Sequence, residues 1–176
     1  MPASYHHLLL TGVPGVGKTT VIRRVAEALA GKRLGGFYTA EIRKAGVRQG
    51  FRLVTFDADE SVIAHVDFNH RYAVGRYGVD VAAIDRLAES SLGLADGIDL
   101  YLVDEIGRME CLSPRFTVGI RALLDSDKPL VATVAKRGGG LIDEVKRRPE
   151  SDLWEVTRAN RQTLASDILA WLRERF

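Results

Sequence analysis

A glycine-rich segment near the start of the chain constrains the fold more than any other feature. The segment Gly12-Val13-Pro14-Gly15-Val16-Gly17-Lys18-Thr19 matches the pattern G-x-x-x-x-G-K-[ST]. The apolar run Leu8-Leu9-Leu10 precedes it, and apolar residues recur at helical spacing after it. We therefore predict a buried strand, a glycine loop and a helix in that order, which is the context in which this pattern binds phosphate.

The residue types of this loop each have a chemical reason. Glycines let the backbone curl so that its N–H groups point at phosphate oxygens, and the helix that follows adds the positive end of its dipole. We expect Lys18 to bridge the β- and γ-phosphates as a catalytic residue, Thr19 to ligate Mg²⁺, and Thr20 to contact the α-phosphate. The predicted nucleotide-binding residues of the loop are Gly12, Val13, Pro14, Gly15, Val16, Gly17, Lys18, Thr19 and Thr20.

A second candidate segment is a hydrophobic strand that ends in acids, Leu100-Tyr101-Leu102-Val103-Asp104-Glu105. Ligands of open α/β sheets gather at the carboxyl ends of strands, so Asp104 is predicted to bind Mg²⁺ directly or through water. Glu105 is expected to be the catalytic base that orients or deprotonates a water. The predicted nucleotide-binding residues here are Leu102, Val103, Asp104, Glu105, Ile106, Gly107, Arg108 and Met109.

The rest of the chain alternates strands and helices, which predicts a mostly parallel sheet covered on both faces. Residues 36 to 67 differ, because β-rich runs separated by short polar turns favour antiparallel strands there, with Gly46 and Gly50 in turns. Ser113-Pro114 and Asp80 are predicted helix starts, and Asn160 is expected to cap the last helix. Thr133 ends another apolar strand and is interpreted equally well as a core residue or as a contact of the water or γ-phosphate.

Composition narrows the class of protein. The 176 residues are 46% hydrophobic and 27% charged, which predicts one domain over residues 1–176. A net charge of +2 gives no sign of nucleic-acid binding, although a basic patch is compatible with it. One cysteine, Cys111, excludes an internal disulfide. The segment Met1 to Leu10 lacks the features of a signal peptide and no run is long enough to span a membrane, so a cytoplasmic monomer is expected.

Several blocks together resemble the small thermophilic-type nucleoside-triphosphatase family, which includes the human cancer-related nucleoside triphosphatase. Besides the glycine loop through Thr20, the blocks are Gly36 to Arg43, Gly50-Phe51, Val74-Gly75-Arg76-Tyr77 and Asp104-Glu105-Ile106-Gly107-Arg108-Met109-Glu110. The resemblance implies a RecA-like P-loop domain, a three-layer sandwich that hydrolyses ATP, GTP, CTP and UTP slowly with Mg²⁺. The family's Thr-x-Glu-Asn-Arg block reads Thr157-Arg158-Ala159-Asn160-Arg161 here, which leaves any role of that acid in doubt.

A cation near the γ-phosphate would neutralise charge in the transition state. Each candidate is also interpretable as an ordinary surface cation. Gly138-Gly139-Gly140 after two of the candidates would suit a mobile lid. The candidates are Arg43, Arg48, Arg76, Arg108, Lys136, Arg137 and Arg161.

Three functions remain open on the sequence. A nucleoside-triphosphate phosphatase would use water as the acceptor. A small-molecule or polynucleotide kinase would bind its acceptor at the extra β-region, with the glycine-rich segment Arg137 to Leu141 as a lid. A nucleotide switch of the GTPase type is disfavoured, because no Asn-Lys-x-Asp sequence is present to read guanine. Hydrolysis is the first hypothesis and the kinase is the alternative.

Overall fold

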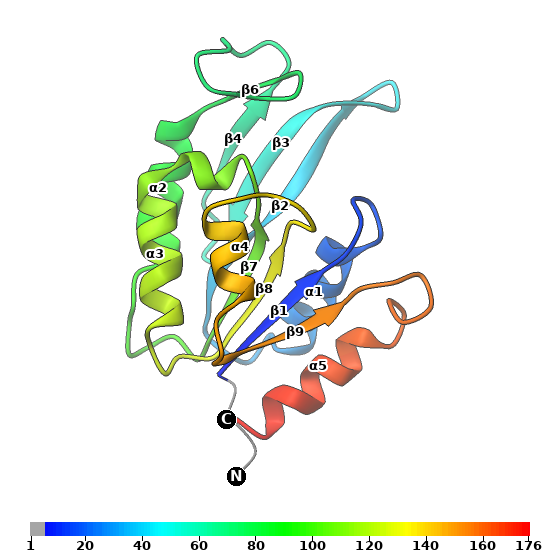
Figure 1. The fold of residues 1–176 in the computed structure, drawn as a ribbon, viewed down its shortest axis with the longest axis vertical. Helices are drawn as coiled ribbons and strands as arrows, with labels where there is room; N and C mark the ends of the chain where they lie inside the picture. Colours follow the sequence, from blue (N-terminus) through cyan, green and yellow to red (C-terminus); the bar gives the residue numbers. More distant parts are fainter. Residues whose placement is uncertain (1–5) are drawn as a thin grey trace.

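The computed structural model describes residues 6–176. The first five residues of the segment Met1 to Leu10, which lacks the features of a signal peptide, lie outside the described residues. Within the described residues one sheet has nine strands in the order β5-β6-β4-β3-β2-β7-β8-β1-β9 (Figure 1). The strands are β1 (His7–Thr11), β2 (Leu34–Lys44), β3 (Val47–Thr55), β4 (Glu60–His65), β5 (Ala73–Val74), β6 (Tyr77–Val79), β7 (Leu100–Ile106), β8 (Leu130–Val134) and β9 (Ser151–Glu155). The helices are α1 (Lys18–Ala28), α2 (Val81–Ser91), the 3₁₀ turn η1 (Glu110–Leu112), α3 (Pro114–Leu124), α4 (Leu141–Lys146) and α5 (Leu164–Arg173).

The sheet has a parallel part and an antiparallel part that share strand β2. Strands β2, β7, β8, β1 and β9 pair in parallel, and β3, β4, β6 and β5 extend the sheet beyond β2 in antiparallel pairs. The antiparallel region predicted at about 36–67 is confirmed, and it continues the main sheet as far as Val79. Gly46 lies in a turn, but the turn predicted at Gly50 is wrong: Gly50 lies inside β3, where a Cβ atom would come 2.2 Å from the Ala64 carbonyl oxygen.

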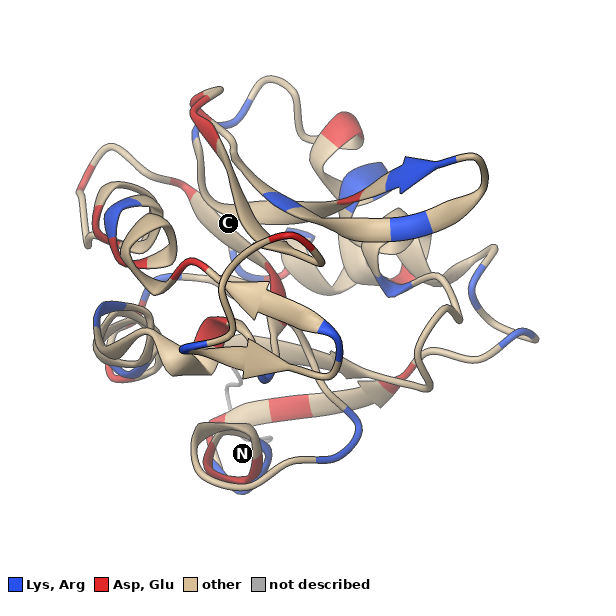
Figure 2. Ribbon diagram, turned by 90° about the horizontal axis from the view of Figure 1, so that it is seen from above, with Lys and Arg blue, Asp and Glu red and all other residues tan. Residues whose placement is uncertain are grey.

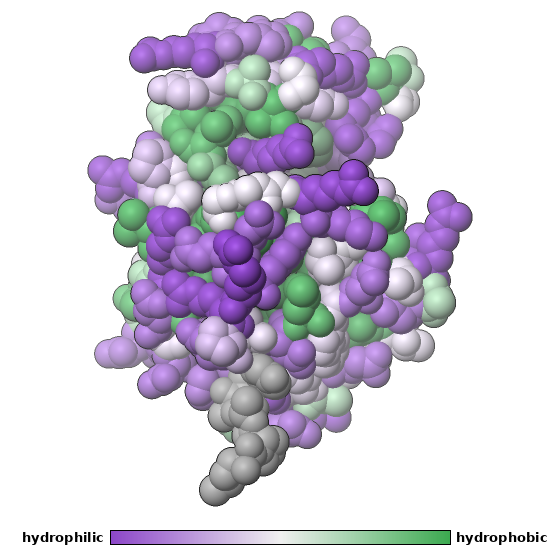
Figure 3. Space-filling view, in the orientation of Figure 1, coloured by the Kyte–Doolittle hydropathy of each residue, from purple (hydrophilic) through white to green (hydrophobic). Residues whose placement is uncertain are grey.

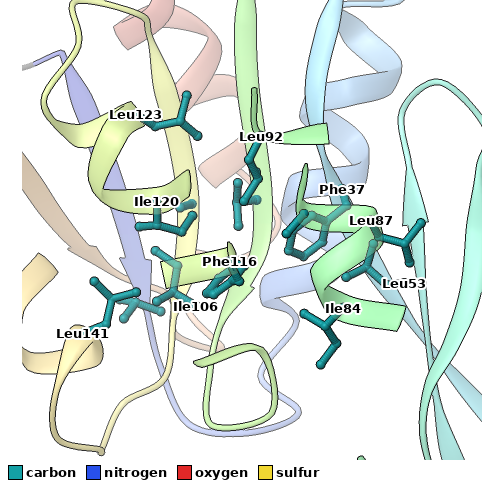
Figure 4. Packing of buried hydrophobic residues seen from close by; sticks show 14 of the residues in the cluster. Phe37, Leu53, Ile84, Leu87, Leu92, Ile106, Phe116, Ile120, Leu123 and Leu141 are labelled. Atoms are coloured by element: carbon teal, nitrogen blue, oxygen red, sulfur yellow. The ribbon is translucent and has the colours of Figure 1, made fainter. Parts of the chain in front are cut away.

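Helices cover both faces of the parallel part, which confirms the predicted three-layer α/β sandwich (Figure 1). The face covered by α2, α3 and α4 carries the larger hydrophobic cluster, in which Phe37 lies beside Leu87 and Phe116 beside Ile106 (Figure 4). Helices α1 and α5 cover the other face with a second cluster that includes Ile22 and Ile168. Burial on both faces explains the continuous apolar runs in β1, β7 and β8.

Helix starts follow the predicted capping residues in two of three cases. The Asp80 carboxylate accepts a hydrogen bond of 3.0 Å from the Ala83 amide, and the Ser113 hydroxyl accepts one of 3.0 Å from the Phe116 amide. The cap predicted at Asn160 is wrong, because α5 begins only at Leu164. The Asn160 side chain instead accepts a 2.8 Å hydrogen bond from the Thr157 amide and closes the turn after β9, a local bond that Asn favours over helix.

The surface is mixed in charge and mostly hydrophilic. Segments with Lys or Arg and segments with Asp or Glu are interspersed in the view of Figure 2. On the face shown in Figure 3, hydrophilic residues predominate and hydrophobic ones form patches between them. Within residues 6–176 none of the helices has the length and apolar character needed to cross a bilayer.

Candidate nucleotide-binding site

The glycine loop joins β1 to α1 at the carboxyl end of the parallel strands. Gly15 and Gly17 have φ angles of 77° and 115°, a left-handed region that other residues enter only at a cost. A Cβ atom at Gly12 would lie 2.7 Å from the Val156 carbonyl oxygen, so the loop also packs closely on the segment after β9. Glycine at these three positions therefore permits a tight curl that leads directly into the N-terminus of α1.

Lys18 lies inside this curl and is only 8% exposed. Its ammonium donates a hydrogen bond of 2.8 Å to the Gly12 carbonyl and one of 3.4 Å to that of Val13. The same Nζ atom is 3.8 Å from Oε2 of Glu105. The ammonium is thus held between the loop and the acidic end of β7, where it can face a phosphate bound in the loop.

Asp104 is the most densely hydrogen-bonded acid of the site and is 1% exposed. Its Oδ2 accepts hydrogen bonds from the hydroxyls of Thr19 at 2.7 Å and Thr39 at 3.1 Å, and its Oδ1 accepts one of 2.8 Å from Thr133. These three donors belong to α1, β2 and β8. Three elements therefore fix one carboxylate. Thr133 is buried like a core residue, but its hydroxyl donates a hydrogen bond to Asp104.

Thr39 was missed as a site residue. Thr39 belongs to the Gly36-Phe37-Tyr38-Thr39 block, but that block indicated only a resemblance to a family and predicted no role for the threonine. The available signal was topological, since β2 pairs in parallel with β7 and Phe37 is in register with Val103. Two residues further on, β2 has reached Thr39 and β7 has reached Glu105, so Thr39 lies level with the acids that end β7.

The Thr19 hydroxyl and the Asp104 carboxylate form a donor pair suited to a divalent cation. Both atoms are hard oxygen ligands, and they lie in direct contact at 2.7 Å. Mg²⁺ typically takes one or two protein oxygens and completes its shell with phosphates and water. The side chains present therefore fit a magnesium ion bound together with a nucleotide.

Glu105 reaches the loop because the end of β7 is irregular. Val103 is in register with Ala132 and Ile106 with Val134, so β7 has one extra residue between these pairs. Such a bulge breaks the strict alternation of side chains, and both acids turn toward the loop. The peptide between Asp104 and Glu105 is cis. Burial and the charge of Asp104 raise the pKa of Glu105, outweighing the opposite effect of Lys18.

The other nucleotide-binding residues predicted on this segment differ in how deeply their side chains are buried. The side chains of Leu102, Val103 and Ile106 are fully buried in the two hydrophobic clusters, so only their backbone faces the site. Gly107 follows directly on the strand, Met109 packs against the larger cluster, and Arg108 is exposed.

Among the candidate cations, Arg161 is the one that touches the loop. Its Nη1 donates a hydrogen bond of 3.2 Å to the Val16 carbonyl. Arg43 and Arg48 both pair with Glu41 on the antiparallel extension, and Arg76 bonds to the Arg48 carbonyl. Lys136 lies 3.4 Å from Glu155, and Arg137 is exposed before the three glycines. The structure therefore singles out Arg161 as a neighbour of the phosphate loop.

Arg161 also lines a small hollow beside the loop. The hollow has a volume of about 130 Å³ and is lined by Gly17, Thr20, Arg24, Arg161 and Gln162. A larger hollow of about 440 Å³, lined by residues 94–96 and 126–128, lies before β7 and β8, at the opposite end of the parallel strands. The smaller hollow is the one that adjoins the phosphate loop.

Comparison with known proteins agrees with this geometry. A family model described as NTPase matches residues 7–169. The nucleoside-triphosphatase THEP1 of Thermotoga sp. (strain RQ2) is 38% identical over 94% of this chain and 95% of its own length. THEP1 of Methanocaldococcus jannaschii is 34% identical over 92% of this chain and 94% of its own length.

Two solved structures have the same fold. The crystal structure of THEP1 from the hyperthermophile Aquifex aeolicus has a TM-score of 0.86 at 36% identity and covers 94% of this chain and 98% of that one. The solution structure of a human cancer-related nucleoside triphosphatase has a TM-score of 0.81 at 32% identity, covering 96% and 98%. From the family model, the relatives and the shared fold it follows that the chain belongs to the NTPase family that includes the THEP1 nucleoside-triphosphatases.

Proposed function

We propose that this protein is a Mg²⁺-dependent nucleoside-triphosphatase that removes the terminal phosphate of ATP, GTP, CTP and UTP within one P-loop domain. The observation that carries the proposal is the approach of Lys18 Nζ to Glu105 Oε2 at 3.8 Å, beside the bonded pair of Thr19 and Asp104. A phosphate ligand, a base and a pair of metal-binding oxygens thus meet at one point. The relatives named above are nucleoside-triphosphatases, and their names give the kinase alternative no support.

The residues define a direct displacement by water. Glu105 accepts a proton from the water as its oxygen bonds to the γ-phosphorus, and the bond from that phosphorus to the bridging oxygen breaks. The electron pair stays on the nucleoside diphosphate, and inorganic phosphate is the second product. Lys18 balances charge on the β- and γ-phosphates. When bound, Mg²⁺ supplies further neutralisation of the phosphate oxygens from its place beside Thr19 and Asp104.

The order of the strands gives the nucleotide a direction. The acids on β7 lie on one side of β1, and β9 with the turn to Arg161 lies on the other. With the γ-phosphate near Glu105, the nucleoside end points toward the hollow of Thr20, Arg24, Arg161 and Gln162. Arginine and glutamine side chains offer stacking and hydrogen bonds to any base, which supports weak base selectivity.

The test is a stoichiometric one. Purified protein is incubated with each of the four nucleoside triphosphates and Mg²⁺, without any phosphate acceptor, and both products are quantified. One inorganic phosphate per diphosphate is expected for all four, with kcat/KM values within about tenfold of one another, which corresponds to differences of up to about 1.4 kcal/mol between the base contacts. Diphosphate formed without free phosphate, or turnover only after an acceptor is added, would refute hydrolysis. Mixing EDTA into the assay should stop the release.

A further inference from the structure

Glu110 is a buried acid that the reaction above does not use. It begins the 3₁₀ turn η1, three residues after Gly107, and is only 6% exposed. Asp and Glu are almost never fully buried unless a partner or a proton compensates. Its position directly after the strand that carries Asp104 and Glu105 raises the question of what its carboxyl group does there.

The carboxyl groups of Glu105 and Glu110 border the same small space above Gly107. A Cβ atom built on Gly107 would lie 2.8 Å from Oε1 of Glu105 and 2.9 Å from Oε2 of Glu110. Any side chain at position 107 would therefore meet both carboxyl groups. Gly107, which has no side chain, keeps the space between these two oxygens open, while the other oxygen of Glu105, Oε2, lies 3.8 Å from Lys18 Nζ.

Two carboxyl groups this close do not both ionise readily. Burial, followed by the charges of Glu105 and Asp104, raises the pKa of Glu110 to about 8, although the backbone N–H groups of Glu110 and Gly107 donate hydrogen bonds to its carboxyl group and act in the opposite direction. Glu105 has the ammonium of Lys18 beside it, which favours its ionised form. The ammonium beside Glu105 and the deeper burial of Glu110 both favour placing a shared proton on Glu110.

Three charged side chains on the elements packed against η1, Asp85, Arg115 and Arg121, have hydrogen-bond or ion-pair partners of their own. Asp85 of α2 accepts a hydrogen bond from the Ser113 hydroxyl. On α3, Arg115 pairs with Glu89 at 2.9 Å and Arg121 with Glu144 at 2.9 Å. On η1 itself, burial and Glu110 raise the pKa of Cys111 to about 12, so this thiol stays neutral. The acids on β7 are therefore the charges that act on Glu110.

We propose that Glu110 is a positioning residue for hydrolysis: its neutral carboxyl group donates a hydrogen bond to Glu105 and holds that carboxylate toward the attacking water. This inference rests on the proposed role of Glu105 as the base. Glu110 needs no contact with the nucleotide, because it acts on the orientation of Glu105. A donor at position 110 is the chemical requirement, and an ionised carboxylate there would turn Glu105 away.

The experiment compares two substitutions of similar volume in the full-length protein with Mg²⁺ and ATP. Glu110→Gln keeps a donor at every pH and should retain kcat within about threefold. Glu110→Met fills the same space without a donor and should lower kcat by roughly 10- to 100-fold with KM unchanged, the scale of a misplaced catalytic group. In the parent, kcat should decline as pH rises through about 8, and in Glu110→Gln this decline should vanish. Cys111→Ala, one residue on, serves as the control and should match the parent.

The inference is overturned if Glu110→Met keeps kcat within threefold of the parent, or if Glu110→Gln falls as low as Glu110→Met. Thermal unfolding and nucleotide binding are measured for each variant. Should Glu110→Met fail to fold, the pH profile of Glu110→Gln decides, since an unchanged alkaline decline contradicts the role of Glu110. Glu105→Gln distinguishes a failure of the proposed function from a failure of the positioning role. Full activity in Glu105→Gln refutes the assigned base. Loss of activity in Glu105→Gln together with an active Glu110→Met refutes only the positioning role of Glu110.

Discussion

The Thr19 hydroxyl donates a 2.7 Å hydrogen bond to Oδ2 of Asp104, which joins the first turn of α1 to the end of β7 across 85 residues of sequence. The two oxygen donors proposed for Mg²⁺ are thereby in direct contact. Thr39 and Thr133 hold the same carboxylate from β2 and β8. Three elements thus restrict this carboxylate, and a side chain already held in place loses less conformational entropy on binding a ligand.

Asp104→Asn tests the metal site. The amide keeps the shape of the side chain but removes the charge that a divalent cation requires, so the Mg²⁺ concentration for half-maximal rate should rise about 10- to 100-fold. The measurement is the hydrolysis rate across a Mg²⁺ titration at saturating ATP. Asp96→Asn, at the hollow on the opposite end of the strands, is the control and should leave the titration unchanged. An unaltered Mg²⁺ requirement in Asp104→Asn contradicts the assignment.

Lys18→Ala should abolish measurable binding of nucleoside triphosphates. The ammonium lies inside the loop, and its loss removes the positive charge that faces the β- and γ-phosphates. We expect Kd for ATP, measured by calorimetry, to rise at least about 100-fold, which corresponds to roughly 3 kcal/mol. Lys44→Ala, an exposed lysine at the end of β2, should bind like the parent. Parental affinity in Lys18→Ala would show that phosphate binds elsewhere.

Glu105→Gln should bind nucleotide normally and hydrolyse it at least about 100-fold more slowly, because an amide cannot accept the proton of the water. The parent needs Glu105 ionised, so its rate should fall as pH decreases through the pKa of this group. Burial and Asp104 raise that pKa above the ordinary 4.5, which moves the acidic decline to higher pH than for an exposed glutamate. A parent profile flat down to pH 4.5, or a Glu105→Gln rate equal to that of the parent, rules out this base.

Gly36→Ala should destabilise the fold strongly. Gly36 has a φ of 89°, and a Cβ atom there would lie 1.9 Å from the Leu102 carbonyl oxygen, inside the paired strands β2 and β7. The expected loss in free energy of unfolding is about 3 kcal/mol or more, from strain and steric overlap together. Urea denaturation measures it. Gly31→Ala, where a Cβ atom has open space and φ is not positive, should change stability by less than about 1 kcal/mol.

Stability should depend on pH through Glu110. Its pKa is about 8 in the folded protein and near the ordinary 4.5 when unfolded, so the folded state holds one more proton between these values. Stability then falls as pH rises through this window, and the contribution of Glu110 is fully present only below about pH 4.5. Glu110→Gln cannot ionise and should raise Tm relative to the parent more at pH 8 than at pH 5. An equal difference in Tm at the two pH values would contradict a raised pKa.

Much of the site was predictable because it follows from local patterns. The glycine loop, the buried lysine and an acid at the end of an apolar strand each depend on a few neighbouring residues, and the alternation of strands and helices indicated the layers. The antiparallel region was predictable for the same reason, since polar turns separate its β-rich runs. What these signals share is that the residues that carry them are close in sequence.

The parts that escaped prediction depend on distant partners. The direction of the Glu105 side chain depends on the bulge between Val103 and Ile106. This bulge is a shift in register relative to β8, so the sequence of β7 alone does not reveal it. The hydrogen bond from Thr39 to Asp104 depends on the pairing of β2 with β7. Asn160 looked like a helix cap because its alternative, a turn closed by bonds to Thr157 and Glu155, is visible only in three dimensions.

Strand β2 belongs to both halves of the sheet, and this has a practical consequence. Its first residues, through Phe37, pair with β7, and the residues from Phe37 to Lys44 pair with β3. Thr39 lies near the start of the part paired with β3 and donates its hydroxyl to Asp104. One irregularity, between Ile42 and Arg43, interrupts the pairing of β2 with β3 between the hairpin tip and that threonine. The hairpin is therefore joined to the carboxylate through one continuous strand, which makes it a suitable point at which to attach a probe that reports on the site.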